Sequence, residues 1–453
     1  MLAAIMPLLF FIAGGLSVAY FRILDEKAYW PIALAAFALA VLTSRDRQKA
    51  AETALSGMTD RVVIMMIMAW LLAATLGQFL RAAEVVPELA TLLIRLGATG
   101  GMFVAGTFVL SAVVATATGT SVGTVLICTP LLFPLGAEVG ADPTILLGAI
   151  LGGGAFGDDF SPLSDTTIAS AETQNVPVRD AVLDRLRYIA IPALVAFVLF
   201  GVFGGTEAAG AAGTESIRQS VNASSLWMLL SPLAVLILSK NILHALLSGI
   251  VVAVLVGLVT GITPPEMLFS IDPRNSSATS IIIDGMNRGV GVSIISILLI
   301  GAVSIVISQP AISNLLEKNS KPLSPAKAET QLASVTIGAN LLLAHNTVAI
   351  LATAPLALTL RRRGGLTGLR TAQIVDISAN TVMHLFPYMV TVIMAVALAS
   401  ADLRKYGIEE LNPFAVGFSN YHSLALLGMV VGVISTGMFR TREAGNTDRD
   451  STH

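Results

Sequence analysis

The chain has 453 residues, of which 55% are hydrophobic and only 12% are charged, and its mean hydropathy is +0.80. Soluble domains carry about a quarter charged residues, so this composition excludes a soluble globular class and indicates an integral membrane protein built from helices. The net charge of −2 gives no basic surface for nucleic acid, and the single Cys128 excludes an internal disulfide framework or a cysteine metal cluster. Nothing in the sequence suggests a cofactor.

Apolar runs, taken in chain order, predict the membrane spans. The amino-terminal stretch lacks the basic region and the cleavage site of a signal peptide, so we expect it to be the first span. The expected spans are 2–20, 30–43, 62–80 and 188–204 in the first half, and 226–239, 242–262, 290–308 and 421–439 in the second. Interrupted apolar stretches cover 100–171 and 332–400, and 86–98 is expected to form an interfacial helix.

Three prolines recur at a constant distance, which suggests a duplication. Pro7, Pro130 and Pro162 return as Pro232, Pro355 and Pro387, each 225 residues later. We expect a first repeat over 1–204, a linker over 205–225, a second repeat over 226–439 and a polar tail over 440–453. Each repeat is expected to hold about five transmembrane helices, one re-entrant hairpin and one broken helix. Repeats with broken helices in corresponding places indicate a secondary transporter.

The distribution of lysine and arginine predicts the orientation in the membrane. Five crossings per repeat make the second repeat inverted relative to the first. A cytoplasmic amino terminus then places 18 of the 27 basic residues, Arg185 and Arg370 among them, in cytoplasmic loops. We therefore expect a multi-pass protein of the plasma (inner) membrane with both termini in the cytoplasm.

The segment 148–171, GAILGGGAFGDDFSPLSDTTIASA, brings carboxylates and hydroxyls between apolar flanks. Pro162 and the glycines before it predict a break in the helix near 157–164, which would free backbone carbonyls beside these side chains. The side chains are those of Asp158, Asp159, Ser161, Ser164, Asp165, Thr166 and Thr167. Such an all-oxygen environment suits a small hard cation. The alternative is an ordinary solvated loop between two spans.

Crowded carboxylates inside a membrane cannot all stay ionised. A cation and a proton would then compete for the same oxygens. Competition for one site is a sufficient physical basis for obligatory exchange.

Each interrupted stretch is expected to begin with a hairpin whose tip meets the other repeat. The first tip, 115–124, presents Thr120 and Ser121, and the equivalent tip, 344–347, presents Asn346 and Thr347. The second broken helix keeps the break but loses the carboxylate cluster, since Asp159 corresponds to His384. Its polar candidates are Asp376, Ser378, Asn380, Thr381 and His384. His384 would either titrate, bond a carboxylate or serve a structural role.

The string GDDFSPLSDTT resembles the NhaC family of Na+/H+ antiporters, in which Gly-Asp-x-x-Ser-Pro-x-Ser-Asp-Thr-Thr is characteristic. The resemblance implies the larger ion transporter superfamily, with inverted repeats, two re-entrant hairpins, a scaffold, a moving domain and a homodimer. It also implies cation ligands at the residues that match the motif, which are Asp158, Ser161, Ser164, Asp165 and Thr166. Asp159 departs from the pattern of several family members, so the site charge differs.

The lead hypothesis is a cation/proton antiporter that exchanges Na+, with Li+ or K+ as alternatives, by alternating access. The alternative is a Na+- or H+-coupled transporter or exchanger of a small organic anion or amino acid, as in malate/lactate exchange. Phe156-Gly157-Asp158 resembles part of the Gly-x-Gly-Asp motif of an intramembrane aspartyl protease, but Ala155 stands at the position of the first glycine and no Tyr-Asp partner occurs, which disfavours that class. A channel is a further alternative, but three carboxylates at one helix break together with a duplication suit an alternating-access transporter better. We therefore expect a transporter rather than an enzyme.

Overall fold

The computed structural model describes residues 2–21, 26–83, 90–91, 93–205, 242–272, 277–309, 321–343 and 345–440. Within these ranges the chain is helical, apart from an antiparallel hairpin of β1 (Ser270–Asp272) and β2 (Ser277–Thr279). Three predictions lie wholly or mostly outside the described residues: the span 226–239, the linker 205–225 and the tail 440–453. The predicted interfacial helix 86–98 is described only in part, and residues 90–91 and 93–95 of it are helical.

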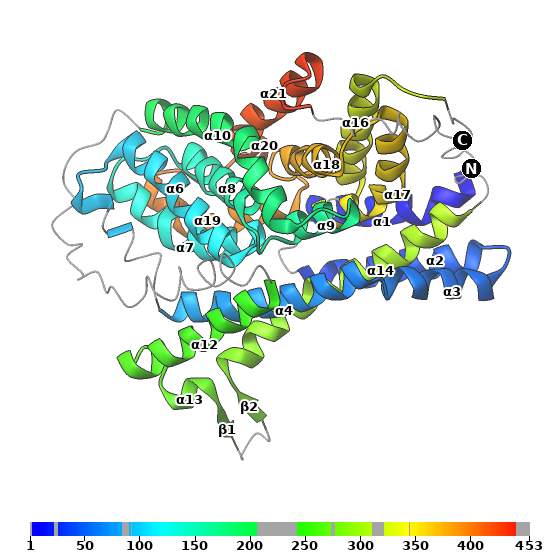
Figure 1. Ribbon diagram of the computed structural model, residues 1–453. Coiled ribbons are helices and arrows are strands. Elements are labelled where there is room, and N and C mark those ends of the chain that lie inside the picture. Colours follow the sequence, from blue (N-terminus) through cyan, green and yellow to red (C-terminus); the bar gives the residue numbers. More distant parts are fainter. Residues whose placement is uncertain are drawn as a thin grey trace, which may run out of the picture.

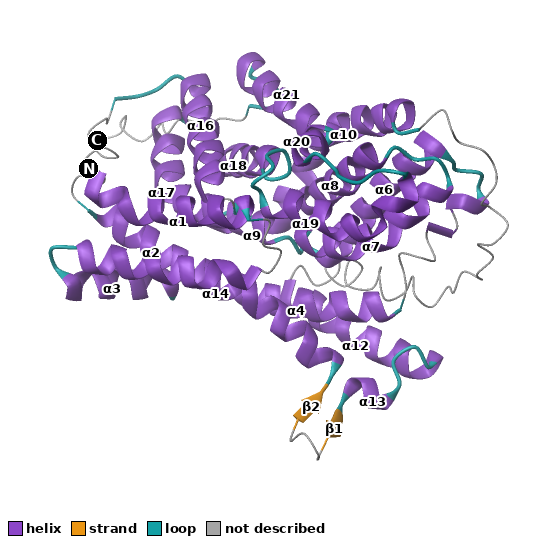
Figure 2. Ribbon diagram, turned by 180° about the vertical axis from the view of Figure 1, so that it is seen from behind, coloured by secondary structure: helices purple, strands orange, loops and turns teal. Residues whose placement is uncertain are grey.

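The helices form two layers, seen from opposite sides in Figures 1 and 2. The first, which we call the α4–α14 layer, contains α2 (Tyr29–Thr43), α3 (Arg47–Met58), α4 (Arg61–Ala82), α12 (Ile242–Thr260) and α14 (Ile281–Ser308). In both views these helices lie along one side of the molecule, and the β-hairpin projects from one end, beside α13 (Pro265–Leu268). The helix α1 (Leu2–Tyr20) and the short 3-10 helix η1 (Glu26–Ala28) pack against α2.

The second layer, which we call the α8–α18 layer, contains both interrupted stretches. The first gives α6 (Gly100–Thr118), α7 (Ser121–Glu138), α8 (Pro143–Phe160), α9 (Asp165–Thr173) and α10 (Val178–Phe203). The second gives α16 (Pro325–Leu343), α17 (Asn346–Gly364), α18 (Gly368–Val382), α19 (Val390–Ala399), η2 (Ser400–Tyr406), α20 (Pro413–Phe418) and α21 (Tyr421–Thr436).

Helix starts in the α8–α18 layer recur at the spacing of the prolines. The helices α6, α7, α8 and α9 begin 225 residues before α16, α17, α18 and α19. The packing is reciprocal, because α9 contacts α17 while α19 contacts α7. The first break falls at 161–164, inside the predicted 157–164, and the second falls at 383–389. These correspondences support the predicted duplication.

Close packing between helices depends on glycine. A Cβ on Gly153 would lie 2.3 Å from the carbonyl oxygen of Phe108, and one on Gly157 would lie 2.3 Å from that of Ala112. The α8 helix therefore sits directly against the backbone of α6, as close approach through small residues allows. In the other layer a Cβ on Gly285 would lie 2.4 Å from the Cα of Thr75, so α14 is held equally close to α4.

Five described helices are long and apolar enough to cross a membrane. They are Val63–Ala82, Gly100–Thr118, Ser121–Glu138, Val178–Phe203 and Ile281–Ser308. Shorter apolar helices are Ile5–Val18, Tyr29–Thr43, Leu246–Thr260, Val390–Ala399 and Tyr421–Thr436. The helices α1, α2, α4, α12 and α21 begin within one residue of the expected spans.

The starts of α10 and α14 were predicted too late. The helix α10 begins at Val178 rather than near residue 188, so Arg185 lies inside a helix and is fully buried. Arg370 is likewise buried, within α18. Assigning these two residues to cytoplasmic loops was therefore wrong. The error arose because the first turns of α10 are too polar to extend an apolar run.

Candidate ion-binding site

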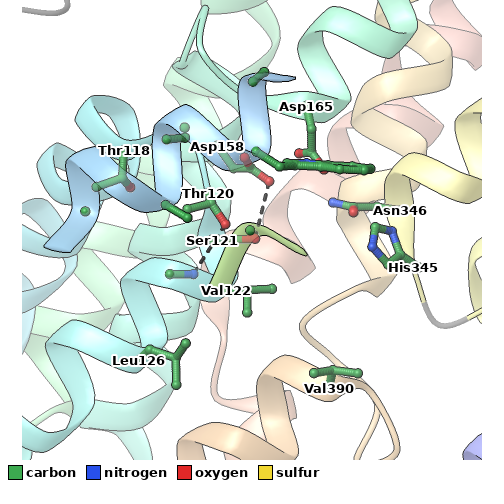
Figure 3. Close-up of a pocket in the computed structure, with 18 of the residues that line it drawn as sticks. Thr118, Thr120, Ser121, Val122, Leu126, Asp158, Asp165, His345, Asn346 and Val390 are labelled. Carbon is green, nitrogen blue, oxygen red and sulfur yellow. Dashed lines mark hydrogen bonds between the residues drawn. The ribbon is translucent and has the colours of Figure 1, made fainter. Parts of the chain in front are cut away.

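A cavity of about 320 Å³ lies between the two layers. Trp70 and Arg81 on α4 and Tyr29 on α2 line it from the α4–α14 layer. The other layer contributes both predicted hairpin tips and two of the three predicted carboxylates. These residues include Thr120, Ser121, Asp158, Asp165, His345 and Asn346 (Figure 3). Residue 344 of the second tip lies outside the described residues.

Four helices begin at this cavity. Their first residues, Ser121 of α7, Asp165 of α9, Asn346 of α17 and Val390 of α19, all line it. The backbone N–H groups of a first helical turn lack partners within the helix and carry partial positive charge. The cavity therefore favours negative charge, whether it resides on a protein carboxylate or on a bound anion.

The carboxylate of Asp158 faces the cavity and is only partly satisfied by hydrogen bonds. It lies in the last turn of α8 and is 1% exposed. The Ser121 hydroxyl donates to its Oδ2 at 3.3 Å (Figure 3). Its Oδ1 has no hydrogen-bond partner among the described residues. A buried carboxylate with a free oxygen is costly unless it takes up a proton or a cation.

Asp165 begins α9 and connects three parts of the molecule. Its Oδ2 accepts from the indole N–H of Trp70 at 2.9 Å and from the Thr347 hydroxyl at 2.5 Å, while its Oδ1 accepts from the backbone N–H of Thr166 at 3.0 Å. Trp70 lies in the α4–α14 layer, and Thr347 lies in the carboxyl-terminal half of the chain, on α17. The carboxylate therefore has donors from both layers and from both halves of the chain.

Asp159 does not face the cavity but meets the second broken helix. Its Oδ1 accepts from Asn380 Nδ2 at 2.6 Å, and its Oδ2 has no partner within the part of the chain that the structure describes. The Oδ1 of Asn380 accepts from Asn346 Nδ2 at 2.8 Å, and Asn346 Oδ1 accepts from the backbone N–H of Thr347 at 3.0 Å. Side chains of the second repeat thus join Asp159 to Asp165.

Arg185 is a member of this network that the sequence interpretation missed. Its guanidinium pairs with Asp376 at 2.5 Å, and both side chains are 0% exposed. It also donates to Gln373 Oε1 at 2.9 Å, to Thr167 Oγ1 at 2.7 Å and to the carbonyl oxygen of Asp159 at 3.1 Å. Asp376 therefore has a resident cationic partner. No clear signal in the sequence pointed to this role, because Arg185 lies among other charged residues in the polar first turns of α10.

Several predicted ligands have other hydrogen-bonding roles. Ser161 donates to the carbonyl oxygen of Thr116 at 2.8 Å and accepts from the Leu163 N–H, so it closes the break. The hydroxyls of Ser164 and Thr166 bond each other at 2.9 Å. Thr120 accepts from the Gly123 N–H as the cap of α7.

The remaining second-repeat candidates do not line the cavity. The Thr381 hydroxyl donates to the Ser378 carbonyl oxygen at 2.8 Å, and no described group bonds the buried Ser378 hydroxyl. The imidazole Nδ1 of His384 forms a hydrogen bond with the Thr391 hydroxyl at 3.0 Å. Among the described residues, the imidazole forms no hydrogen bond with a carboxylate. Of the three alternatives for His384, this geometry favours a structural role.

The three carboxylates do not form one preformed cage. Among the described residues, no group of three or more His, Cys, Asp or Glu side chains converges as metal ligands do. Asp158 and Asp165 face the cavity, whereas Asp159 faces Asn380. A cation at Asp158 and Asp165 would complete its shell with hydroxyls, backbone carbonyls or water, as hard cations commonly do.

The amino-terminal half of the chain matches a known protein family. Residues 1–205 match the model of the Na+/H+ antiporter family. The resemblance drawn from the GDDFSPLSDTT string to the NhaC-type members of this family is thereby confirmed.

Two curated proteins are similar to part of the chain. The Na+/H+ antiporter NhaC of Bacillus subtilis (strain 168) is 29% identical over 230 residues, which cover 46% of this chain and 47% of the relative. The malate-2H+/Na+-lactate antiporter of the same organism is 32% identical over 144 residues, which cover 30% of this chain and 31% of that protein. The aligned part thus spans about half or less of each relative's length.

Solved transporter structures share the fold. The YdaH transporter of Alcanivorax borkumensis is 12% identical, with a TM-score of 0.58 over 86% of this chain and 89% of that chain. At this identity the likeness shows the fold alone. The chain is thus an all-α polytopic membrane protein, as its composition predicted, and it shares its fold with this transporter.

Proposed function

We propose that the protein exchanges Na+ for protons across the membrane, with Asp158 and Asp165 as the shared binding site. The observation that carries this proposal is the Asp158 carboxylate, 1% exposed, with one oxygen that no described group bonds, at a cavity between the two layers. Such a group is stable when it holds a proton or a cation, and the two exclude each other. Exchange follows if the layers move only when the carboxylates are neutralised.

The polar side chains divide between binding and support in this proposal. Ser121 and Thr347 bond the carboxylates through hydroxyls, which can also present oxygen lone pairs to a cation. Asn380, Asn346 and Thr347 link Asp159 to Asp165 through hydrogen bonds, so the charge on one carboxylate influences the other. Li+ and K+ are the alternative cations for the same oxygens.

The membrane arrangement is part of the same proposal. The halves 1–204 and 226–439 are duplicated and inverted, with the hairpins α6–α7 and α16–α17 as their re-entrant elements. The protein spans the plasma (inner) membrane as a homodimer, with both termini in the cytoplasm. The 225-residue recurrence of helix starts supports the duplication.

A second candidate is coupled transport of a small organic anion. The observation that favours it is the cavity, whose volume of about 320 Å³ is far above the roughly 30 Å³ that one water fills in the liquid. The four helix starts that line it would bind a carboxylate. The relative described as a malate-2H+/Na+-lactate antiporter handles such substrates.

Proton movement in proteoliposomes with a lumenal pH dye decides between the two. Na+, Li+, K+ and choline salts are added in turn, followed by lactate, malate or arginine. Cation-dependent proton movement without any organic solute supports the antiporter. Proton movement that begins only after an organic solute is supplied contradicts it and supports the second candidate.

A further inference from the structure

The hydrogen bond between Trp70 and Asp165 joins the two layers at the candidate cation site. Trp70 is 9% exposed and lies on α4, which the close contact of Gly285 and Gly289 holds against α14. Its indole N–H donates to Asp165 Oδ2 at 2.9 Å. Asp165 belongs to the other layer, at the start of α9.

The same carboxylate oxygen also accepts from Thr347 at 2.5 Å. An oxygen with two donors directed at it has no lone pair left for a cation. The two donors differ in what they can do next. A threonine hydroxyl is both donor and acceptor, so Thr347 can turn its lone pairs toward a cation without leaving the site. An indole N–H is a donor only, so Trp70 cannot become a ligand.

We propose that Trp70 and the transported cation are alternative partners of Asp165, so that cation binding displaces the indole and releases one layer from the other. This rests on the proposed function, because it makes Trp70 a positioning residue of the exchange cycle. The indole N–H substitutes for part of the positive charge that the carboxylate needs. Loss of that bond on cation binding removes a direct polar link from α4 to α9.

His345 fits the same arrangement from the second hairpin tip. Its ring meets the Trp70 ring edge-on, with centroids 6.4 Å apart and an interplanar angle of 65°. An indole that swings away from Asp165 therefore also changes its contact with α17. Movement of Trp70 would therefore change its contacts with Asp165 and with His345, which lie in different halves of the chain.

The first test measures transport in Trp70→Phe, which keeps an aromatic ring and removes the N–H donor. Without a competitor the half-saturating Na+ concentration should fall by about tenfold, the factor expected for one hydrogen bond to a charged group. Trp30→Phe is the matched control, because Trp30 also lies in the α4–α14 layer but donates to the carbonyl oxygen of Gly291 at 3.2 Å. An unchanged half-saturation in Trp70→Phe, or an equal shift in Trp30→Phe, overturns the proposal.

The second test keeps Trp70 and measures its fluorescence emission. The chain has three tryptophans, so Trp30→Phe/Trp227→Phe leaves Trp70 as the single one. Titration with Na+ at constant ionic strength should give a saturable change in its emission as the indole loses its bond. Adding Asp165→Asn should abolish the change, and choline should produce none. No change in emission up to concentrations that saturate transport overturns the proposal.

Failure of the proposed function is distinguishable from failure of this inference. A wild-type protein that moves no protons in response to any cation contradicts the antiporter itself. A wild-type protein that exchanges Na+ for protons, while Trp70 responds in neither test, leaves the antiporter standing and contradicts only the role of Trp70.

Discussion

Removing either member of the Arg185–Asp376 pair measures how strongly this buried ion pair holds the second repeat to α10. In Arg185→Gln the carboxylate of Asp376 loses a cation at 2.5 Å and keeps hydrogen bonds from Ser170 at 2.6 Å and Asn380 at 3.3 Å. A buried charge left without its partner costs about 3–5 kcal/mol of unfolding free energy. Asp376→Asn leaves the guanidinium unpaired and should cost a similar amount.

The double variant Arg185→Gln/Asp376→Asn removes both charges. No unpaired charge is then left buried, so the loss should fall below the roughly 3–5 kcal/mol of either single variant and far below their sum of about 6–10 kcal/mol. Unfolding free energies are measured in micelles of one fixed composition. The exposed pair of Lys405 and Asp402, at 2.9 Å, is the control, for which each change should cost at most about 1 kcal/mol. A double variant whose loss equals the sum of the single losses would refute the reasoning.

Two further predictions concern packing and the Asp159 link. Gly157→Ala places a Cβ 2.3 Å from the Ala112 carbonyl oxygen and should lower the unfolding free energy by about 1–3 kcal/mol. Gly338→Ala, on α16, places a Cβ with no atom within 4 Å and should raise the unfolding free energy by up to about 1 kcal/mol. Equal effects of the two changes would contradict the account. Asn380→Leu removes the donor that favours an ionised Asp159, so exchange should require a more alkaline pH, and an unchanged pH–activity profile would count against the link.

Helix boundaries and breaks could be predicted because they depend on the residues of one segment. Pro162 and its glycines predicted the end of α8, and α9 does begin again at Asp165. The 225-residue spacing of prolines extended the same pattern to α18 and α19, where the break has no carboxylate cluster beside it. Composition, periodicity and the break were sufficient for the fold class and for the region of the candidate site.

Side-chain partners could not be predicted in the same way, because they depend on which helices pack together. Asp158 and Asp159 are neighbours, but successive residues of a helix point about 100° apart, so one faces the cavity and the other faces Asn380. Ser161 has the chemistry of a ligand, yet its hydroxyl closes the break. Nothing in the sequence singled out Trp70, whose bond to Asp165 depends on the packing of α4 against α9.

Competition between a cation and a proton for Asp158 and Asp165 is the central claim. Its most direct test is calorimetric titration of the purified protein with Na+ over a series of pH values, in buffers of different ionisation enthalpy. The account predicts that binding releases one proton and that the apparent affinity weakens about tenfold for each unit of falling pH once the shared site is protonated. Asp158→Asn should abolish both effects, and Asp402→Asn should change neither. Na+ binding that is independent of pH and releases no proton would contradict the claim.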